Sequence, residues 1–273
     1  MTGDALFRMD PAKPSGLLTV PKPTPSEAVD SPARMARYPL WAQDLILESR
    51  EAKEAVTRHE AWRLMSEGTI SRRLHRIMLV GFWPLIEKFP HFLSLNLLKT
   101  TQGRDAGVNA ARTWLARNLR AEAKHAEWYL DWAEGLGVGR DEMFDGAPPV
   151  EMAAIAEWCW RISHVGGLAE GMVATNYAVE GATGEWVREV APSEPYRRLF
   201  APAAIDRTMR WLEAHADYDA SHPFEALDII AQLLGADPPR ERLRGIRHAV
   251  TRSYELYRLA LDVALERGGT ETT

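Results

Sequence analysis

The sequence contains a single cysteine, Cys159, among 273 residues. One thiol cannot form an intrachain disulfide, so a disulfide framework and a cysteine-rich zinc site are both excluded. Such cysteine usage fits the reducing cytoplasm. Cys159 lies between Trp158 and Trp160 in an apolar stretch, which favours a buried thiol over a reactive nucleophile.

Long apolar runs and concentrations of positive charge are also missing. No stretch approaches the roughly 20 apolar residues that a membrane span needs, and the N-terminus lacks the apolar segment of a signal peptide. The formal net charge is −5, with acidic and basic residues interleaved, so the basic footprint of a nucleic-acid-binding protein is absent. We expect a cytoplasmic protein that contacts neither membrane nor nucleic acid and binds a small molecule.

Convincing β-strand patterns are absent as well, and the sequence predicts an all-α protein. Residues 1–35 are rich in proline, and we expect a disordered leader there. Residues 36–268 have apolar side chains spaced by three and four, as in helices, and are predicted to form a single domain. Glycine and proline divide this part into about seven helices, which would form a bundle: 40–67, 69–100, 103–135, 149–184, 206–222, 224–234 and 239–266.

Histidine and aspartate are present in an informative pattern between residues 215 and 222. His215, Asp219 and His222 stand at positions i, i+4 and i+7, which share one face of an α-helix. Two imidazoles and a carboxylate on one face suit a divalent transition metal better than an apolar core. The alternative is a polar outer face that happens to carry two histidines. Pro223 follows directly, so His222 is expected in the last turn of its helix.

Two further segments offer ligands of the same kind. Glu122 and His125 stand three residues apart in the middle of a predicted helix and share a face, although an isolated pair of this kind is more often solvated. Glu180 interrupts an apolar helix just before Gly181. A carboxylate in such a helix is costly unless it is paired or bound to metal, and the alternative is an exposed helix end.

Together the three segments provide more ligands than one ion needs. Three carboxylates and three imidazoles would leave two divalent ions partly positive, with open positions for dioxygen and substrate. The sequence therefore predicts a dinuclear site for iron, with manganese as the alternative metal. The predicted metal ligands, which are also the predicted catalytic residues through the metals, are Glu122, His125, Glu180, His215, Asp219 and His222.

The order of these motifs resembles that of the heme-oxygenase-like diiron oxidases and oxygenases, relatives of the TenA and PqqC proteins. Glu-x-x-His comes first, then Glu-Gly, then His-x-x-x-Asp-x-x-His. The separations are 55 residues from His125 to Glu180 and 35 from Glu180 to His215. They are similar to those of the family's 1-alkene-forming fatty-acid decarboxylase. The likeness covers roughly residues 70–260.

The resemblance implies a heme-oxygenase-like bundle with two Fe(II) ions, O2 as co-substrate and an external reductant. Members of the family pass through a peroxo-diferric intermediate to desaturate, cleave, decarboxylate or N-oxygenate their substrates, and they tend to bind the second iron weakly. The implied substrate is a small amino acid, an amine or an aliphatic carboxylic acid. A homodimer is a possible assembly.

Two other functions stay open at this point. The first keeps the fold without the metals: a TenA-like hydrolase, which would use Cys159, or a cofactor-free PqqC-like oxidase. The second is a non-enzymatic helical binding or regulatory module in which the histidines and acids lie on the surface. His91 and His164 fit no ligand spacing and are predicted to be structural.

Overall fold

The structure is a computed structural model that describes residues 32–218 and 222–269. Within these ranges the regular structure is entirely helical, as predicted. The longer helices are α2 (Leu40–Glu48), α3 (Arg50–Thr57), α5 (Arg72–Leu98), α6 (Ala106–Glu122), α7 (His125–Gly135), α9 (Val150–Val165), α11 (Glu180–Val190), α14 (Arg210–Tyr218), α15 (His222–Leu234) and α16 (Arg240–Gly268). The shorter ones are α1 (Pro32–Met35), α4 (Glu60–Ser66), α8 (Arg140–Asp145), α10 (Leu168–Met172), α12 (Glu194–Arg197) and α13 (Ile205–Thr208). A π-helical stretch, η1 (Val173–Val179), joins α10 to α11, and a 3₁₀ turn, η2 (Pro202–Ala204), precedes α13.

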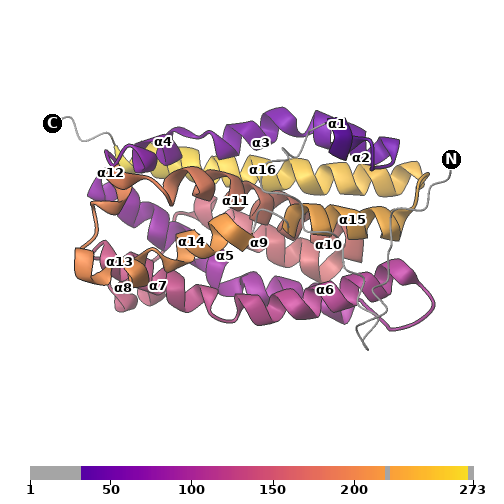
Figure 1. Cartoon of the computed structure of the whole chain (residues 1–273), viewed down its shortest axis with the longest axis horizontal. Coiled ribbons are helices and arrows are strands. Elements are labelled where there is room, and N and C mark those ends of the chain that lie inside the picture. The colour runs from indigo at the N-terminus through magenta and orange to yellow at the C-terminus, as the bar shows by residue number, and fades with distance from the viewer. Residues whose placement is uncertain (1–31, 219–221, 270–273) are drawn as a thin grey trace.

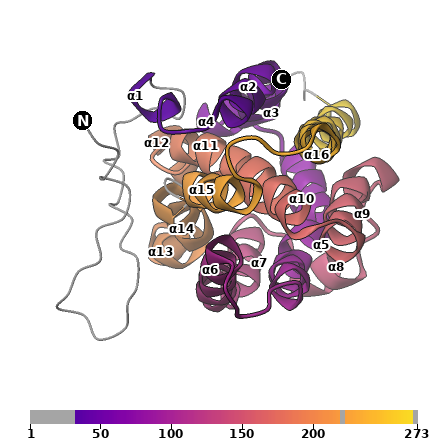
Figure 2. The ribbon, with the colours of Figure 1, turned by 90° about the vertical axis from the view of Figure 1, so that its right-hand side faces the viewer.

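The continuous helical segment made of α10, η1 and α11 forms the centre of the bundle. Every residue of η1 is buried, and η1 packs against α15 and α16. Helices α5 and α16 run along the length of the molecule, with α6 and α7 end to end at one side (Figure 1). Seen along the bundle, the other helices lie around α10 and α11 (Figure 2). Any polar group on η1 is therefore enclosed by protein.

Local sequence signals explain where several of these helices begin. The Ser71 hydroxyl accepts a hydrogen bond from the Leu74 amide at 3.1 Å, and the Asp105 carboxylate accepts one from the Val108 amide at 2.9 Å. Both are N-caps that satisfy amides without a helical partner. Gly68, which follows α4, has a positive φ of 67°. A Cβ atom added to Gly68 would lie only 2.7 Å from the carbonyl oxygen of Pro195. Only glycine fits this turn.

The prediction of about seven helices was too coarse, because several of the predicted helices are broken. The segment predicted as 40–67 forms α2, α3 and α4, since the Ser49 hydroxyl donates to the Leu45 carbonyl and the His59 ring caps the amide of Ala61. The segment predicted as 149–184 is interrupted at Gly166 and Gly167, both in extended conformation. Such local hydrogen bonds and glycines compete with helix continuation.

The predicted leader falls mostly outside the described residues, which begin at residue 32. Its last four residues form α1, where Arg34 and Met35 are buried. The Arg34 guanidinium lies 3.3 Å from the centre of the Phe224 ring, a cation–π contact with α15. The end of the predicted leader thus packs against the bundle.

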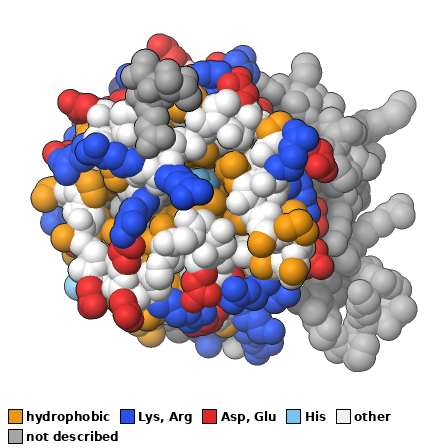
Figure 3. All heavy atoms as spheres, turned by 90° about the vertical axis from the view of Figure 1, so that its left-hand side faces the viewer, with side chains coloured by type: hydrophobic (Ala, Val, Ile, Leu, Met, Phe, Trp, Pro, Cys, Tyr) orange, Lys and Arg blue, Asp and Glu red, His pale blue; other side chains and the backbone are white. Residues whose placement is uncertain are grey.

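Charged side chains are prominent at one end of the molecule (Figure 3). At the end of the molecule shown in Figure 3, Lys and Arg side chains gather around the centre, with apolar side chains between them. Several arginines near this end pair with carboxylates, as Arg207 does with Asp131 and Glu134. Among the described helices, none has both the length and the apolar character needed to traverse a bilayer.

Candidate functional site

Five helices supply the predicted ligands that the structure describes. Glu122 is the last residue of α6, and His125 is the first residue of α7. Glu180 follows η1 directly, His215 lies on α14, and His222 begins α15. Asp219 falls outside the described residues, so its prediction stays a prediction.

The structure brings the five described residues together inside the bundle. The Nδ1 atom of His125 lies 2.7 Å from Oε2 of Glu122, and Nδ1 of His222 lies 2.7 Å from Oε1 of Glu180. The ring centres of His125 and His215 are 4.6 Å apart. Glu122 also lies within electrostatic range of Glu180 and His222. Residues separated by as many as 100 positions in the sequence therefore share one polar cluster.

All five side chains are buried, with exposures between 4% and 8%. The solvated-face and exposed-helix-end alternatives for Glu122, His125 and Glu180 are therefore wrong, as is a surface location for His215 and His222. Polar groups withdrawn from water in this way are costly unless they have partners. The cluster is consequently a feature that the fold maintains against a stability cost.

Burial shifts the ionisation of the cluster. It raises the pKa of Glu122, and it holds the pKa of His215 well below its usual value, with His125 nearby adding to the effect. For His222, burial alone would lower the pKa, but Glu180 and the neighbouring carboxylates outweigh burial and raise it. At neutral pH His215 is thus a neutral imidazole, which is the form that binds metals.

Two predicted helix positions need correction. Glu122 and His125 do not lie in the middle of one helix, because Ala123 and Lys124 form a turn between α6 and α7. His222 begins α15 and does not end the preceding helix, so the predicted stripe is divided between α14 and α15. Pro223 then occupies the first turn of α15, where proline needs no hydrogen-bonded amide. In both cases the ligands still lie close together. They are brought together by the packing of different helices and not by a shared face of one helix.

The donor set fits a transition metal in several respects. Imidazole nitrogens and carboxylate oxygens are ligands for iron, manganese and zinc. The Nδ1–H of His215 donates to the Trp211 carbonyl at 2.7 Å, which leaves the lone pair of this neutral imidazole on Nε2. Despite its closeness to Glu122, Nδ1 of His125 is buried without a hydrogen bond of acceptable geometry. A buried nitrogen of this kind lacks a partner that a metal would provide.

A second unpartnered group lies beside this one. Asn118 is one helical turn before Glu122 and 2% exposed, and neither atom of its amide makes a hydrogen bond. On the other hand, no three His, Cys, Asp or Glu side chains within residues 32–218 and 222–269 surround one point closely enough to hold an ion. The described residues thus bring suitable ligand types to one place, although Asp219 is not among them. Their side chains would have to move closer together to bind a metal ion.

Sequence analysis missed a residue that contacts Glu180. Asn176, in η1, donates from Nδ2 to Oε2 of Glu180 at 2.8 Å, and its own Oδ1 lies 3.0 Å from the Thr175 hydroxyl. Both Thr175 and Asn176 are completely buried. The available signal was the pair of polar residues four and five positions before Glu180 in an otherwise apolar segment.

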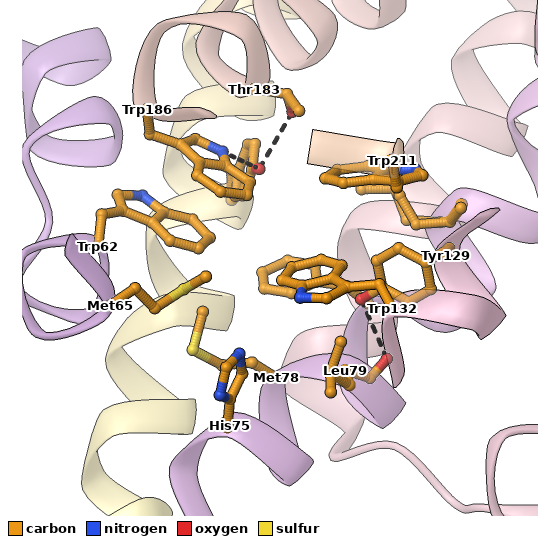
Figure 4. Close-up of a pocket in the computed structure, with 14 residues that line it drawn as sticks. Trp62, Met65, His75, Met78, Leu79, Tyr129, Trp132, Thr183, Trp186 and Trp211 are labelled. Carbon is orange, nitrogen blue, oxygen red and sulfur yellow. Dashed lines mark hydrogen bonds between the residues drawn. The ribbon is translucent and has the colours of Figure 1, made fainter. Parts of the chain in front are cut away.

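A mainly apolar cavity is lined by side chains from several helices (Figure 4). Three of its lining residues follow or precede a site residue by one helical turn. Tyr129 comes one turn after His125, Thr183 one turn after Glu180, and Trp211 one turn before His215. The other walls are aromatic and aliphatic, with Trp62, Trp132 and Trp186 among them. Such an apolar lining is typical of sites that bind small organic molecules.

The rings of this wall pack closely. The ring centre of Trp211 lies 3.9 Å from that of His215. It also lies 5.3 Å from the ring centre of Trp132, on which Trp211 stacks, and 6.2 Å from that of Trp186. Trp211 therefore separates the polar cluster from the cavity. These three tryptophans are buried, as is Trp62.

His75 is a polar residue in the cavity wall. Its Nε2 lies 2.8 Å from the Tyr196 hydroxyl, which also accepts a hydrogen bond from Trp132 Nε1 at 2.9 Å. Burial lowers the pKa of His75 to about 3. His75 is therefore neutral in the folded protein throughout the physiological range.

The depressed pKa of His75 predicts a pH dependence of stability. Between about pH 6.5 and 3 the unfolded chain binds a proton at this residue and the folded chain does not, so stability falls as the pH falls. His75 should account for a loss of about 2 kcal/mol between roughly pH 6.5 and 5. Urea denaturation of His75→Leu should show a shallower pH dependence than the wild type, whatever its absolute stability. His164→Leu, which alters an exposed histidine, is the control. An unchanged slope in His75→Leu would contradict the assignment.

The remaining residues singled out in the sequence lie away from the cluster. Cys159 is completely buried on α9, and burial raises the pKa of its thiol, which confirms the expected buried thiol. His91 and His164 are exposed on α5 and α9. Neither histidine takes part in the polar cluster.

The fold and the site together define a helical-bundle protein with a cluster of buried carboxylates and imidazoles beside an apolar cavity. The chain belongs to the family described as iron-containing redox enzymes, which it matches over residues 51–258. The predicted heme-oxygenase-like fold is thereby confirmed.

Solved structures support the same fold. A TenA homologue from Pseudomonas syringae pv. tomato str. DC3000 is 38% identical, with a TM-score of 0.83 over 90% of this chain and 99% of that chain. A TenA homologue from Pyrococcus furiosus is 16% identical, with a TM-score of 0.65 over 82% of this chain and 100% of that chain. A domain of unknown function with a heme oxygenase-like fold from Shewanella denitrificans is 14% identical, with a TM-score of 0.58 over 85% of this chain and 89% of that chain. The last two show the fold alone. No match is found among curated proteins.

Proposed function

We propose that this chain is an O2-dependent non-heme iron oxidase or oxygenase with a dinuclear iron site. The observation that carries the proposal is the convergence of five buried carboxylate and imidazole side chains from separate helical segments. Membership of a family described as iron-containing redox enzymes supports the choice of iron. Manganese is the alternative metal for the same ligands.

The proposed ligands are the five described residues together with Asp219. Bound iron would supply the one-electron and O2 chemistry that amino-acid side chains lack. The protein contributes orientation, because the Trp211 carbonyl fixes the tautomer of His215, and the pair of Glu180 and His222 is held at 2.7 Å. It also limits access by water, since the cluster is enclosed and bordered by the tryptophan wall of the cavity.

The cavity suggests where the substrate binds. A molecule whose reacting end faces the cluster and whose apolar part fills the cavity would contact aromatic rings along most of its length (Figure 4). Among the expected substrates, an aliphatic carboxylic acid or amine fits this wall better than a compact, highly polar amino acid. Complete reduction of O2 to water takes more electrons than the oxidation of one substrate C–H bond supplies. An external reductant is therefore proposed to supply the others.

The direct test is oxygen consumption by metal-loaded protein. Protein loaded anaerobically with Fe(II) is desalted and mixed with O2, a reductant and series of aliphatic acids, amines and amino acids. Protein loaded with redox-inert Zn(II) is the control. We expect substrate-dependent O2 uptake and an oxidised product, identified by mass spectrometry, with iron only. Equal O2 uptake with iron and zinc would contradict the proposal.

A metal-free TenA-like hydrolase or PqqC-like oxidase is the second candidate, and the similarity to the Pseudomonas syringae TenA homologue favours it. The hydrolase version needs a nucleophile, and the chain has only one cysteine. Cys159 is completely buried, and its thiolate is disfavoured by the raised pKa. The cysteine is therefore poorly placed for this chemistry.

Replacement of Cys159 by alanine separates these candidates. We expect the variant to keep the O2-dependent activity of the wild type, because the buried thiol only fills space on α9. The stability cost should be small, since only one sulfur atom is removed. A hydrolytic activity that needs no O2 and is lost in a variant whose thermal unfolding is unchanged would favour the hydrolase. Activity and melting temperature measured side by side decide the matter.

A further inference from the structure

Thr175 and Asn176 form a polar pair in the central segment of the bundle. Both are completely buried, and their neighbours in η1 are apolar. Neither belongs to the proposed ligand set. Because a buried polar side chain is costly without partners, its hydrogen bonds indicate what keeps it in place.

The amide of Asn176 connects this pair to Glu180. Its Nδ2 donates to Oε2 of Glu180 at 2.8 Å, while Oε1 of the same carboxylate lies 2.7 Å from Nδ1 of His222. Each oxygen of Glu180 therefore has a defined neighbour on a different helical segment. The carboxylate is held from two sides, and its rotation about the terminal bond is restricted.

Thr175 fixes the orientation of that amide. Its hydroxyl lies 3.0 Å from Oδ1 of Asn176 and 2.9 Å from the Gly171 carbonyl, and it shares its hydrogen between them. With Oδ1 facing the hydroxyl, the NH2 group of Asn176 faces Glu180. The flipped amide would instead place its oxygen against the Glu180 carboxylate, which cannot donate a hydrogen bond when ionised.

The backbone around this pair is unusual. Residues 173–179 are π-helical, a conformation that is rare and is frequently found at functional sites. The stretch contains neither glycine nor proline, and it packs against α15 and α16. It ends directly before Glu180, at the point where the carboxylate meets His222.

We propose that Asn176, oriented by Thr175, is a positioning residue that holds Glu180 ready to bind metal, so that metal affinity depends on this hydrogen bond. The inference rests on the proposed function, because it assigns Glu180 to the metal site. It goes further by giving the site a support outside the ligand set. Supports of this kind around metal ligands commonly set affinity as well as orientation.

The experiment measures metal affinity in the full-length protein, with Mn(II) followed by electron paramagnetic resonance and Fe(II) followed by anaerobic chelator competition. Asn176→Ala removes the donor to Glu180. Thr175→Val removes the hydroxyl that orients the amide at nearly constant volume. We expect affinity to fall about 10–100-fold in Asn176→Ala and by a smaller factor in Thr175→Val.

Two variants provide matched controls. Asn96, completely buried on α5, bonds to Ser163 and Lys99, and Thr208, buried on α13, bonds to the Ala204 carbonyl four residues back. Asn96→Ala and Thr208→Val impose similar losses of buried polar groups at residues whose hydrogen bonds do not involve Glu180, Thr175 or Asn176. Both should bind metal as the wild type does, and the melting temperature of every variant is measured without metal.

The outcomes distinguish this inference from the proposed function. Weaker metal binding in Asn176→Ala and Thr175→Val, but not in the controls, supports the positioning role. Wild-type affinity in both Asn176→Ala and Thr175→Val overturns it while leaving the proposed function intact. An equal loss of affinity in Asn96→Ala would also overturn it, since the effect would then be general destabilisation. No metal binding by the wild type overturns both.

Discussion

Replacement of His215 by alanine is expected to reduce iron affinity by at least roughly 10–100-fold. Loss of a hydrogen bond that supports a metal ligand already costs about this much, and loss of the ligand itself should cost no less. His215 is buried, neutral at physiological pH and oriented by the Trp211 carbonyl. Its ring lies 4.6 Å from that of His125. Removing it would leave the α14 side of the cluster without an imidazole, and O2-dependent activity should be lost together with the iron.

Iron retention is measured by equilibrium dialysis against Fe(II) under anaerobic conditions. His215→Gln preserves more of the packing against Trp211 and should also lose affinity, which separates ligand loss from a collapsed site. His164→Ala, a change to an exposed histidine on α9, should retain iron as the wild type does. If His215→Ala bound iron with wild-type affinity, His215 would not be a ligand.

Replacement of Trp211 by alanine should have the largest effect on stability. The side chain is 2% exposed and contacts His215, Trp132, Trp186 and Tyr129 through its ring. Large-to-small substitutions of buried aromatic residues typically cost about 3–5 kcal/mol, because both the buried area and the packing are lost. The new space would also join the existing cavity to the polar cluster and admit water.

Urea denaturation at neutral pH measures this cost. Trp160→Ala is the matched control, because Trp160 is 39% exposed on α9, and its loss should change the free energy of unfolding by about 0.5 kcal/mol or less. Trp211→Phe keeps an aromatic ring in the wall and should lose less than Trp211→Ala. Equal stability of Trp211→Ala and Trp160→Ala would contradict the role of Trp211 as the wall between cluster and cavity.

The sequence contained enough information to predict the helical class and to place five side chains in one cluster. Residue type was the main signal, since Glu, His and Asp recur at helical spacing. The long separations between Glu122, Glu180 and His215 were informative only through resemblance to a family, because a single sequence does not show which helices pack together. Asp219 lies outside the described residues, and its role stays a prediction.

Other features depend on tertiary structure and escaped prediction. The turn at Ala123 and Lys124 has no glycine or proline to announce it, and α6 was expected to continue through it. The position of His222 was misjudged because Pro223 can either follow a helix or occupy its first turn. Asn176 looked like an ordinary polar residue until its contact with Glu180 was seen. The cavity, lined by residues from many helices, has no local sequence signal.

The most direct test of the central claim is the iron content of wild-type protein loaded with Fe(II) under anaerobic conditions and freed of excess metal. Total iron per chain and the Mössbauer spectrum before and after exposure to O2 are recorded together. The account predicts between about one and two irons per chain, with a coupled pair of ferric ions appearing after O2 is added. Iron well below one per chain, with no O2-dependent spectral change, would contradict it and leave the metal-free TenA-like function as the better explanation.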